Sequence, residues 1–134
     1  SNTVNLGFTA APVISKQPRD TLACLEETVT FTADGVGNNL TYQWRKNGNN
    51  IENAVGNNFS LTHITASDAG SYDVIVKNSC DLTSISSPAI LKIREPIIIT
   101  SHPRDTTLQA GLPLVLNAKA TGTAIKYQWQ RNSM

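Results

Sequence analysis

Short runs in which apolar and polar residues alternate follow one another along the chain, separated by residues that favour turns. Val29, Phe31 and Ala33 alternate with threonines, and the run that contains Trp44 repeats this pattern. Successive side chains of a β-strand point to opposite faces of a sheet, so each run predicts a strand with one buried face. Strands of this length, with turn residues every 8–12 positions or so, are typical of an all-β sandwich.

Three later segments, residues 59–61, 72–76 and 89–93, predict further strands by the same alternation. Pro18 is expected to break the first strand, because proline cannot donate a backbone hydrogen bond to a neighbouring strand. Asn47-Gly48 predicts a hairpin turn, since both residues tolerate a positive φ. The inward positions of these strands define the predicted core, which comprises Phe31, Trp44, Leu61, Tyr72 and Val74.

The chain also repeats itself at an interval of 85 positions, without an insertion. Tyr42-Gln43-Trp44 recurs as Tyr127-Gln128-Trp129, and Pro18-Arg19-Asp20-Thr21 recurs as Pro103-Arg104-Asp105-Thr106. This period is longer than the 20–50 residues or so of a solenoid unit. It therefore predicts a tandem repeat of whole domains.

The repeat divides the chain into three parts. Residues 1–10 align with residues 86–95, so we expect them to be the closing strand of a preceding module. Residues 11–95 then form one complete module, and residues 96–134 the first part of a following, truncated one. That last part lacks the strands that should cover Tyr127 and Trp129. We expect it to be disordered by itself or to pack against another chain.

A motif in the complete module resembles a known family. Asp68-Ala69-Gly70-Ser71-Tyr72 is similar to the D-x-G-x-Y signature of immunoglobulin domains, and Tyr42-Gln43-Trp44 to their strand with the buried tryptophan. The chain most resembles tandem immunoglobulin-like repeats of bacterial secreted and cell-surface proteins. The resemblance implies a Greek-key β-sandwich in which Asp68, Gly70 and Tyr72 form a tyrosine corner.

The two cysteines depart from the family pattern. Ala33 and Val74 stand where an antibody-type domain has its cysteines, whereas Cys24 and Cys80 lie just outside strands. The strand from Tyr72 should separate them by roughly 20 Å, and a disulfide needs Cα atoms within ~7 Å. We hypothesise that each cysteine bridges to a neighbouring module. Two free thiols, or a bridge within the module in another strand register, are the alternatives.

Composition and charge exclude several classes of function. The 11 Lys and Arg residues against 10 Asp and Glu residues leave a net charge of +1, which does not favour capture of nucleic acid or an anionic membrane. Only 16% of residues are charged, so Asn, Ser and Thr must supply much of the polar surface, as on many secreted β proteins. No apolar run approaches the ~18 residues that cross a bilayer, so we expect no membrane insertion.

The candidates for chemistry are few. His63 and His102 lack the spacing of a zinc site, no Gly-x-Ser-x-Gly motif is present, and the acidic residues lack calcium-loop spacing. The aromatic residues fall on core-facing positions, which leaves no ring to stack on a sugar. We expect no catalytic residue, no metal and no cofactor.

The remaining candidates are loops expected at one pole of the sandwich. They are formed by Val36, Gly37, Asn38 and Asn39 in one loop and by Ser79 and Asp81, beside Cys80, in the other. Loops on a rigid scaffold commonly bind partners. We favour the simpler interpretation that they contact the preceding module.

These patterns together predict a non-catalytic module of an extracellular, secreted or surface-attached protein. It would act as a spacer or stalk and take part in adhesion or protein binding, with neighbouring modules as its first partners and a protein or glycan at the cell surface as a further one. The alternative is an accessory domain of a large secreted enzyme that binds carbohydrate or positions the catalytic domain.

Overall fold

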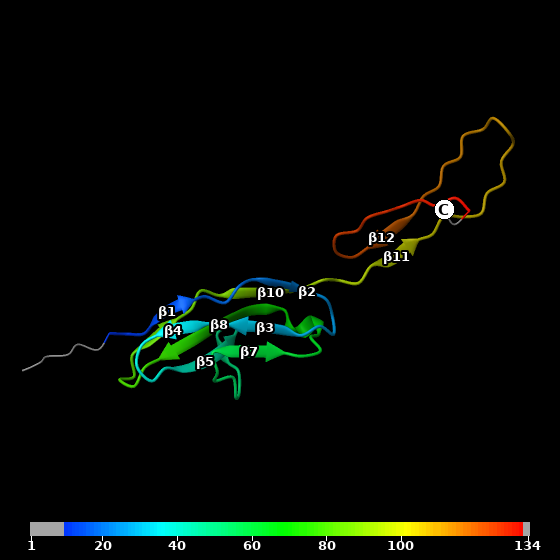
Figure 1. Ribbon diagram of the computed structural model, residues 1–134. Helices are drawn as coiled ribbons and strands as arrows, with labels where there is room; N and C mark the ends of the chain where they lie inside the picture. The colour runs from blue at the N-terminus through cyan, green and yellow to red at the C-terminus, as the bar shows by residue number, and fades with distance from the viewer. Residues whose placement is uncertain (1–9, 133–134) are drawn as a thin grey trace, which may run out of the picture. The chain divides into compact units, whose positions relative to one another are not determined.

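The computed structural model describes residues 10–132 and divides the chain into two compact units, Ser1–Ile93 and Arg94–Met134 (Figure 1). The predicted closing strand of a preceding module, residues 1–10, lies almost wholly outside the described residues. The regular structure of residues 10–132 is β-strand apart from one 3-10 turn, η1 (Ala66–Asp68). The prediction of an all-β fold is thus confirmed.

Two two-stranded ladders, which we together call the first sheet, follow an extended run that Ala33 divides into β3 and β4. The four strands are β1 (Val13–Lys16), β3 (Val29–Thr32), β4 (Asp34–Val36) and β7 (Asn58–Leu61). β3 pairs antiparallel with β7, and β4 pairs antiparallel with β1. The N–H of Ala33 donates to the carbonyl oxygen of Asn57 (2.9 Å), so the run stays hydrogen-bonded across the division.

The second sheet of the first unit has six strands. They are β2 (Thr21–Ala23), β5 (Thr41–Lys46), β6 (Asn49–Asn50), β8 (Gly70–Lys77), β9 (Thr83–Ile85) and β10 (Ala89–Ile93). The order is β2-β10-β8-β5-β6, and β9 also pairs with β8. β2 and β10 run parallel to each other, and the other pairs are antiparallel.

The predicted first strand changes sheet near Pro18. β1 ends at Lys16 in the first sheet, and β2 begins at Thr21 in the second. Two side chains between these strands bind β10 and the segment just before it. The Gln17 side-chain amide oxygen accepts from the Ser87 N–H, and the Asp20 carboxylate accepts from the Ile90 N–H, both at 2.8 Å. Residues 17–20 are therefore fixed by side-chain hydrogen bonds, although the backbone pairing between β1 and β2 is interrupted there.

Aromatic side chains dominate the core between the two sheets. Phe31, Trp44, Tyr72 and Val74 are at most 2% exposed, and the rings of Phe31 and Tyr72 stack at 4.9 Å between centroids. Burying side chains of this size stabilises the fold by about 1.5–3 kcal/mol each. Leu61 is only partly buried and packs against this cluster from its edge.

One predicted loop is a strand. Residues 35–39 carry the composition of a turn, but Gly35 and Val36 belong to β4 and pair with Ile14 and Val13. A Cβ at Gly35 would lie 3.0 Å from the Leu40 side chain and 3.2 Å from that of Val76. Glycine is therefore suited to this position because the strand passes close to its neighbours, and the loop begins only at Gly37.

The second unit contains β11 (Ile98–Ser101) and β12 (Lys119–Thr121), which pair antiparallel. These strands lie 85 positions after β1 and β4, and their register matches: Ile99 pairs with Ala120 as Ile14 pairs with Gly35. Both pairs also have a register shift at the equivalent place, between Ile14 and Lys16 in the first pair and between Ile99 and Ser101 in the second. In this unit Tyr127 is 58% exposed and Trp129 is 54% exposed.

Candidate functional site

A tyrosine corner fixes the start of β8. The Tyr72 hydroxyl donates to the backbone carbonyl of Asp68 (2.7 Å), four residues upstream. The Asp68 carboxylate in turn accepts from the N–H (2.8 Å) and the hydroxyl (2.9 Å) of Thr65, which closes the turn at η1. The three motif residues Asp68, Gly70 and Tyr72 are therefore brought together by one short turn.

Ionisation at this corner follows from its contacts. Hydrogen bonding from the Thr65 N–H to the Asp68 carboxylate is the main cause that holds the pKa of that group below its usual range. Burial, with the nearby Asp68 charge second, raises the pKa of Tyr72 to about 12. Both pKa shifts favour a neutral Tyr72 hydroxyl, which can donate, beside an ionised Asp68 carboxylate. The two groups therefore have a structural role in the turn.

At the opposite end of β8, the side chain of Asn78 organises the pole where the chain enters the unit. Asn78 is 4% exposed, and its amide nitrogen donates to the carbonyl oxygen of Ala10 (2.9 Å). Its amide oxygen accepts from the N–H groups of Cys80 (3.0 Å) and Leu82 (3.1 Å). One buried side chain thus links the entering segment to the turn between β8 and β9.

The sequence interpretation missed Asn78. Its position at the end of a strand, directly before a turn, was the available signal, because asparagine side chains hydrogen-bond to nearby backbone there. The contact with Ala10 has no such signal, since the two residues are 68 positions apart.

The two candidate loops lie together at this entry pole. The Ser79 N–H donates to the carbonyl oxygen of Asn38 (3.3 Å), so the turn after β8 touches the loop after β4. Asn39 and Asp81 have positive φ values of 49° and 63°. Asp81 also forms an ion pair with Lys77, and the hydrogen bond from Lys77 is the main cause that lowers the pKa of Asp81.

The other pole carries Cys24. The Cys24 N–H donates to the Glu27 carboxylate (2.8 Å), and the Glu26 N–H donates to the carbonyl oxygen of Ile64 (2.9 Å). Cys24 and Cys80 are both exposed and unpaired. The eight residues of β8 separate the two poles by roughly 26 Å, so a bridge between these two cysteines within one folded module is not feasible.

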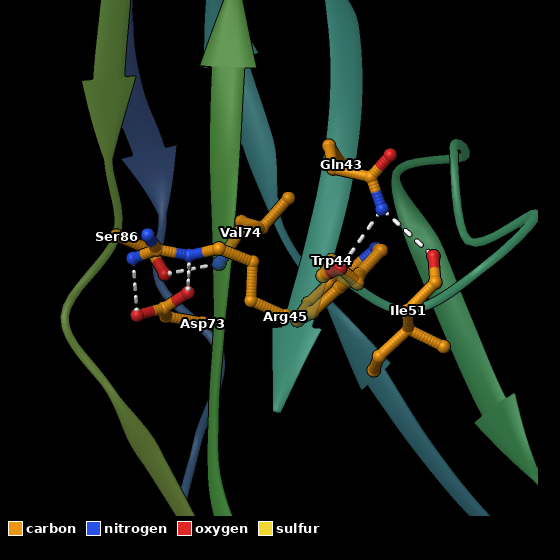
Figure 2. Close-up of polar contacts among 7 residues, drawn as sticks. All are labelled: Gln43, Trp44, Arg45, Ile51, Asp73, Val74 and Ser86. Carbon is orange, nitrogen blue, oxygen red and sulfur yellow. Dashed lines mark hydrogen bonds and ion pairs between the residues drawn. The ribbon is translucent and has the colours of Figure 1, made fainter. Parts of the chain in front are cut away.

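Polar contacts also connect strands on the outer face of the six-stranded sheet (Figure 2). The Arg45 guanidinium forms two hydrogen bonds of 2.7 Å to the Asp73 carboxylate, which lies opposite it on β8. This contact is also the main cause that raises the pKa of Arg45. On the other side of β5, the Gln43 amide donates to the carbonyl oxygens of Trp44 (3.0 Å) and Ile51 (2.8 Å). Arg45 and Asp73 thus bind each other, and the Gln43 amide nitrogen binds backbone carbonyls.

The described residues contain no cluster of side chains suited to hold a metal ion. Within residues 10–132, no three His, Cys, Asp or Glu side chains come close enough to hold a metal ion. His63 is exposed in the first unit, and His102 is exposed in the second. No helix in that range is long and apolar enough to cross a lipid bilayer.

Comparison with known protein families agrees with this architecture. The family described as the immunoglobulin domain matches residues 11–78. The chain belongs to the immunoglobulin domain family. This confirms the resemblance inferred from the tyrosine-corner motif and the buried Trp44.

Solved immunoglobulin structures give the same result at the level of fold. Part of the structure of Sidekick-1 immunoglobulin domains 1–5 superposes with a TM-score of 0.70 at 20% identity, covering 87% of this chain and 26% of that one. An I-band fragment of titin superposes with a TM-score of 0.63 at 21% identity, covering 72% and 37%. At these identities the likeness establishes the fold.

Two proteins of known name are similar to this chain in sequence. Endoglucanase C of Cellulomonas fimi is 25% identical over 117 residues, which is 84% of this chain and 11% of that protein. Hemicentin-1 of Homo sapiens is 33% identical over 88 residues, which is 61% of this chain and 2% of that protein. The chain therefore spans only a small part of either relative.

This immunoglobulin domain holds its sheets together without a disulfide between them. Ala33 and Val74, at the positions where antibody-type domains have cysteines, are both 0% exposed. Trp44 lies in the same core, where its indole N–H donates to the carbonyl oxygen of Gly56 (2.8 Å). Packing around the tryptophan takes the place of the covalent link.

Proposed function

We propose that this immunoglobulin module is a non-catalytic spacer in a tandem array of an extracellular protein. The observation that carries this proposal is the position of the two ends of the first unit. Asn78 holds Ala10 at one pole, and the parallel pairing of β2 with β10 brings Ile93 beside Ala23 at the other. A module that the chain enters and leaves at opposite poles adds its full length to an array.

The module boundaries that we propose are those of the repeat. Residues 11–95 form the complete module, residues 96–134 begin the next, and residues 1–10 close a preceding one. The matching register of β1 with β4 and of β11 with β12 supports the second boundary. So does a matching turn, because the Thr106 hydroxyl donates to the Arg104 carbonyl at 3.2 Å as Thr21 does to that of Arg19.

The entry-pole loops are then the contact surface for the preceding module. Asn38, Asn39, Ser79 and Asp81 are exposed and lie next to Ala10, where that module would end. Cys80 lies in the same surface, and Cys24 lies at the exit pole. In an array, an exit pole faces the next entry pole, so a disulfide between modules is the covalent form of this contact.

Small-angle X-ray scattering of chains with two, three and four copies of the 85-residue repeat tests the spacer function. Each added module should lengthen the maximum dimension by at least about 26 Å, the length of β8 alone. Replacing Asn78 by Ala in every copy should loosen the junctions and broaden the distance distribution. A maximum dimension that does not grow with copy number would rule out an in-line spacer.

One comparison favours a second candidate function, an accessory domain of a secreted glucan-degrading enzyme. Endoglucanase C matches 84% of this chain. The rings of the first unit argue against direct sugar binding, because Phe31, Trp44 and Tyr72 are buried and therefore unable to stack on a sugar. Retention of the chain on insoluble cellulose or on a glucan panel would support the accessory function. Failure of the chain to bind either one would favour the spacer function.

A further inference from the structure

A polar hollow of about 420 Å³ lies where the first unit's chain crosses from the first sheet to the second. Six polar residues line it and define what we call the crossover hollow: Lys16, Gln17, Arg19, Thr21, Thr30 and Thr32. Its volume is within the range of ~300–1,000 Å³ that is usual for small-ligand sites. The lining has two cations and no acidic residue, which suits an anionic ligand.

The change of sheet opens one edge of β3 beside this hollow. β1 leaves the first sheet at Lys16, and β3 pairs with β7 alone within residues 10–132. In an antiparallel ladder, the backbone groups of successive residues point to opposite sides of the strand. The Ala33 N–H donates to Asn57 on the β7 side. The N–H groups of Thr30 and Thr32 therefore point away from β7, to the edge where the hollow lies.

The two cations of the hollow are not neutralised by neighbouring acids. Neither Lys16 nor Arg19 forms an ion pair within residues 10–132. The Asp20 carboxylate, next in the chain to Arg19, accepts from a backbone N–H of β10. Asp34 lies opposite Lys16 in the register of β1 and β4, and its carboxylate accepts from the Asn57 side chain (3.1 Å). The positive charges of Lys16 and Arg19 are thus available to a ligand.

The other side chains supply hydrogen-bond groups for a hydroxylated ligand. The Gln17 amide oxygen is bound to the Ser87 N–H, and its amide nitrogen makes no hydrogen bond within residues 10–132. The Thr30 hydroxyl shares one hydrogen bond with Ser60 (2.8 Å), which leaves part of its capacity to accept. Cations beside neutral donors and acceptors match a sugar ring that carries an acid group.

The hollow recurs in the next repeat. All the residues that line it lie within residues 16–32, so their counterparts within residues 101–117 are all present in the second unit. These counterparts line a hollow of about 240 Å³. Arg19 recurs as Arg104, and the hydrogen bond to its carbonyl oxygen recurs as well. Ser101 replaces the lysine, so the arginine is the cation that both hollows share.

We propose that the crossover hollow binds the acid groups of an anionic polysaccharide. Lys16 and Arg19 pair with its carboxylates or sulfates, and the Gln17 amide and the threonine groups bind neighbouring sugar hydroxyls. A single-stranded nucleic acid needs rings on which its bases stack, and the one ring of the hollow, Phe31, is 2% exposed. Anionic membranes are held by clusters of about 4–8 basic residues, and this hollow has two.

Isothermal titration of the full chain with three soluble polymers tests the ligand class. Short polygalacturonate carries carboxylates, short dextran sulfate carries sulfates, and dextran is the neutral control. We expect saturable binding of at least one acidic polymer and none of dextran. The polymer that binds identifies the acid group, and binding of neither acidic polymer would overturn the proposal.

Charge variants locate the binding in the hollow. A chain with Arg104→Gln keeps the complete hollow of the first unit and serves as the reference. Adding Arg19→Gln should weaken binding roughly tenfold, because a charge-assisted hydrogen bond is lost. Adding Lys92→Gln in its place should leave the affinity unchanged, since this exposed lysine of β10 does not line the hollow. Equal affinities of all three chains would overturn the proposal.

A further variant should bind more tightly. Asp34→Asn removes a negative charge opposite Lys16 and keeps an oxygen for Asn57, so the affinity for the acidic polymer should rise roughly two- to threefold. All the exchanged side chains lie at the surface, and circular dichroism checks that each variant folds. Weaker binding by Asp34→Asn, or equally tight binding of a single-stranded DNA of matched charge by the full chain, would contradict a site for acidic sugars.

This inference goes beyond the spacer function, and the two are tested separately. Binding by one hollow does not require an array, although several hollows in line should hold a long polymer more tightly than one does. Arrays that lengthen with copy number but bind no acidic polymer would reject the ligand alone. Arrays that stay compact and bind the polymer would reject the spacer function alone.

Discussion

Two buried polar side chains hold the ends of β8. Tyr72 binds the Asp68 carbonyl at one end, and Asn78 binds Ala10 and the next turn at the other. A buried polar group is costly unless it is hydrogen-bonded, and both of these side chains have partners. Each therefore fixes a loop at a pole, where neighbouring modules would meet.

Replacing Tyr72 by Phe should lower the free energy of unfolding by about 1 kcal/mol at pH 8, through loss of one hydrogen bond. The wild-type chain should lose further stability as pH rises from 10 to 12. An unfolded tyrosine ionises near pH ~10, whereas the pKa of Tyr72 in the folded state is raised to about 12, so ionisation favours the unfolded state in that interval. Urea unfolding followed by circular dichroism at pH 8 and pH 11 measures both effects.

The Tyr72→Phe variant should lack this alkaline contribution, while Tyr42 and Tyr127 remain in both chains as the background. An equal loss of stability between pH 8 and pH 11 in variant and wild type would contradict the assignment to Tyr72.

Replacing Asn78 by Ala should destabilise the first unit by about 1–3 kcal/mol, because it removes a buried side chain that bonds the Ala10 carbonyl and the N–H groups of Cys80 and Leu82. Thermal unfolding followed by circular dichroism gives this value. The matched control is Asn38→Ala at the same pole, where the side chain is exposed and only the backbone oxygen accepts from Ser79. A control as destabilising as Asn78→Ala would show that the pole responds to any truncation.

At the scale of the secondary-structure element, an ion pair links the paired strands β5 and β8. Arg45 on β5 and Asp73 on β8 lie directly opposite each other and form two short hydrogen bonds, with only 19% and 17% of their side chains exposed. A shift of one residue in register would send the inward residues of β8 to the outer face and separate this pair. The ion pair therefore supports the register that apolar burial selects.

A double-mutant cycle with Arg45→Ala and Asp73→Ala should give a coupling energy of about 0.5–1 kcal/mol, which falls as salt is added. The same cycle on Lys77 and Asp81, an ion pair whose side chains are far more exposed, should give a coupling near zero. Urea unfolding of the seven proteins, the wild type being shared by the two cycles, at low and high ionic strength measures both. Equal couplings for the two pairs would mean that burial does not decide their strength.

At the scale of the whole molecule, the two units differ in how far their apolar residues are covered. Trp44 in the first unit is 0% exposed, and its counterpart Trp129 in the second is 54% exposed. The core of the first unit lies between the six-stranded sheet and the strands β1, β3, β4 and β7, whereas the described residues of the second unit pair β11 with β12. The same local sequence is thus buried in one setting and open in the other.

Both thiols should react with Ellman's reagent in the folded chain, because Cys24 and Cys80 are exposed and unpaired. We expect two equivalents per freshly reduced chain, and one each for the Cys24→Ser and Cys80→Ser variants. After air oxidation, dimers that form in the wild type and are lost in either variant would indicate a disulfide between the two poles of different molecules. A single reactive thiol in the reduced wild type would contradict the structure.

The strands, most of the core and the repeat could be predicted from the sequence alone. Alternation of apolar and polar residues is a local property, and it indicated the inward positions of Phe31, Trp44 and Tyr72. The tyrosine corner was also accessible, because the residues that form it lie within a few positions of one another. The 85-residue repeat needed only comparison of the chain with itself.

Tertiary contacts decided the rest. Residues 35–39 have turn composition, but Gly35 and Val36 became part of β4 because β1 pairs with them. Asn78 and the Arg45–Asp73 pair acquired their roles from partners 68 and 28 positions away, which no local pattern encodes. Local periodicity fixes which face of a strand is buried, but hydrogen bonds and ion pairs between distant segments depend on which segments the folded chain places side by side.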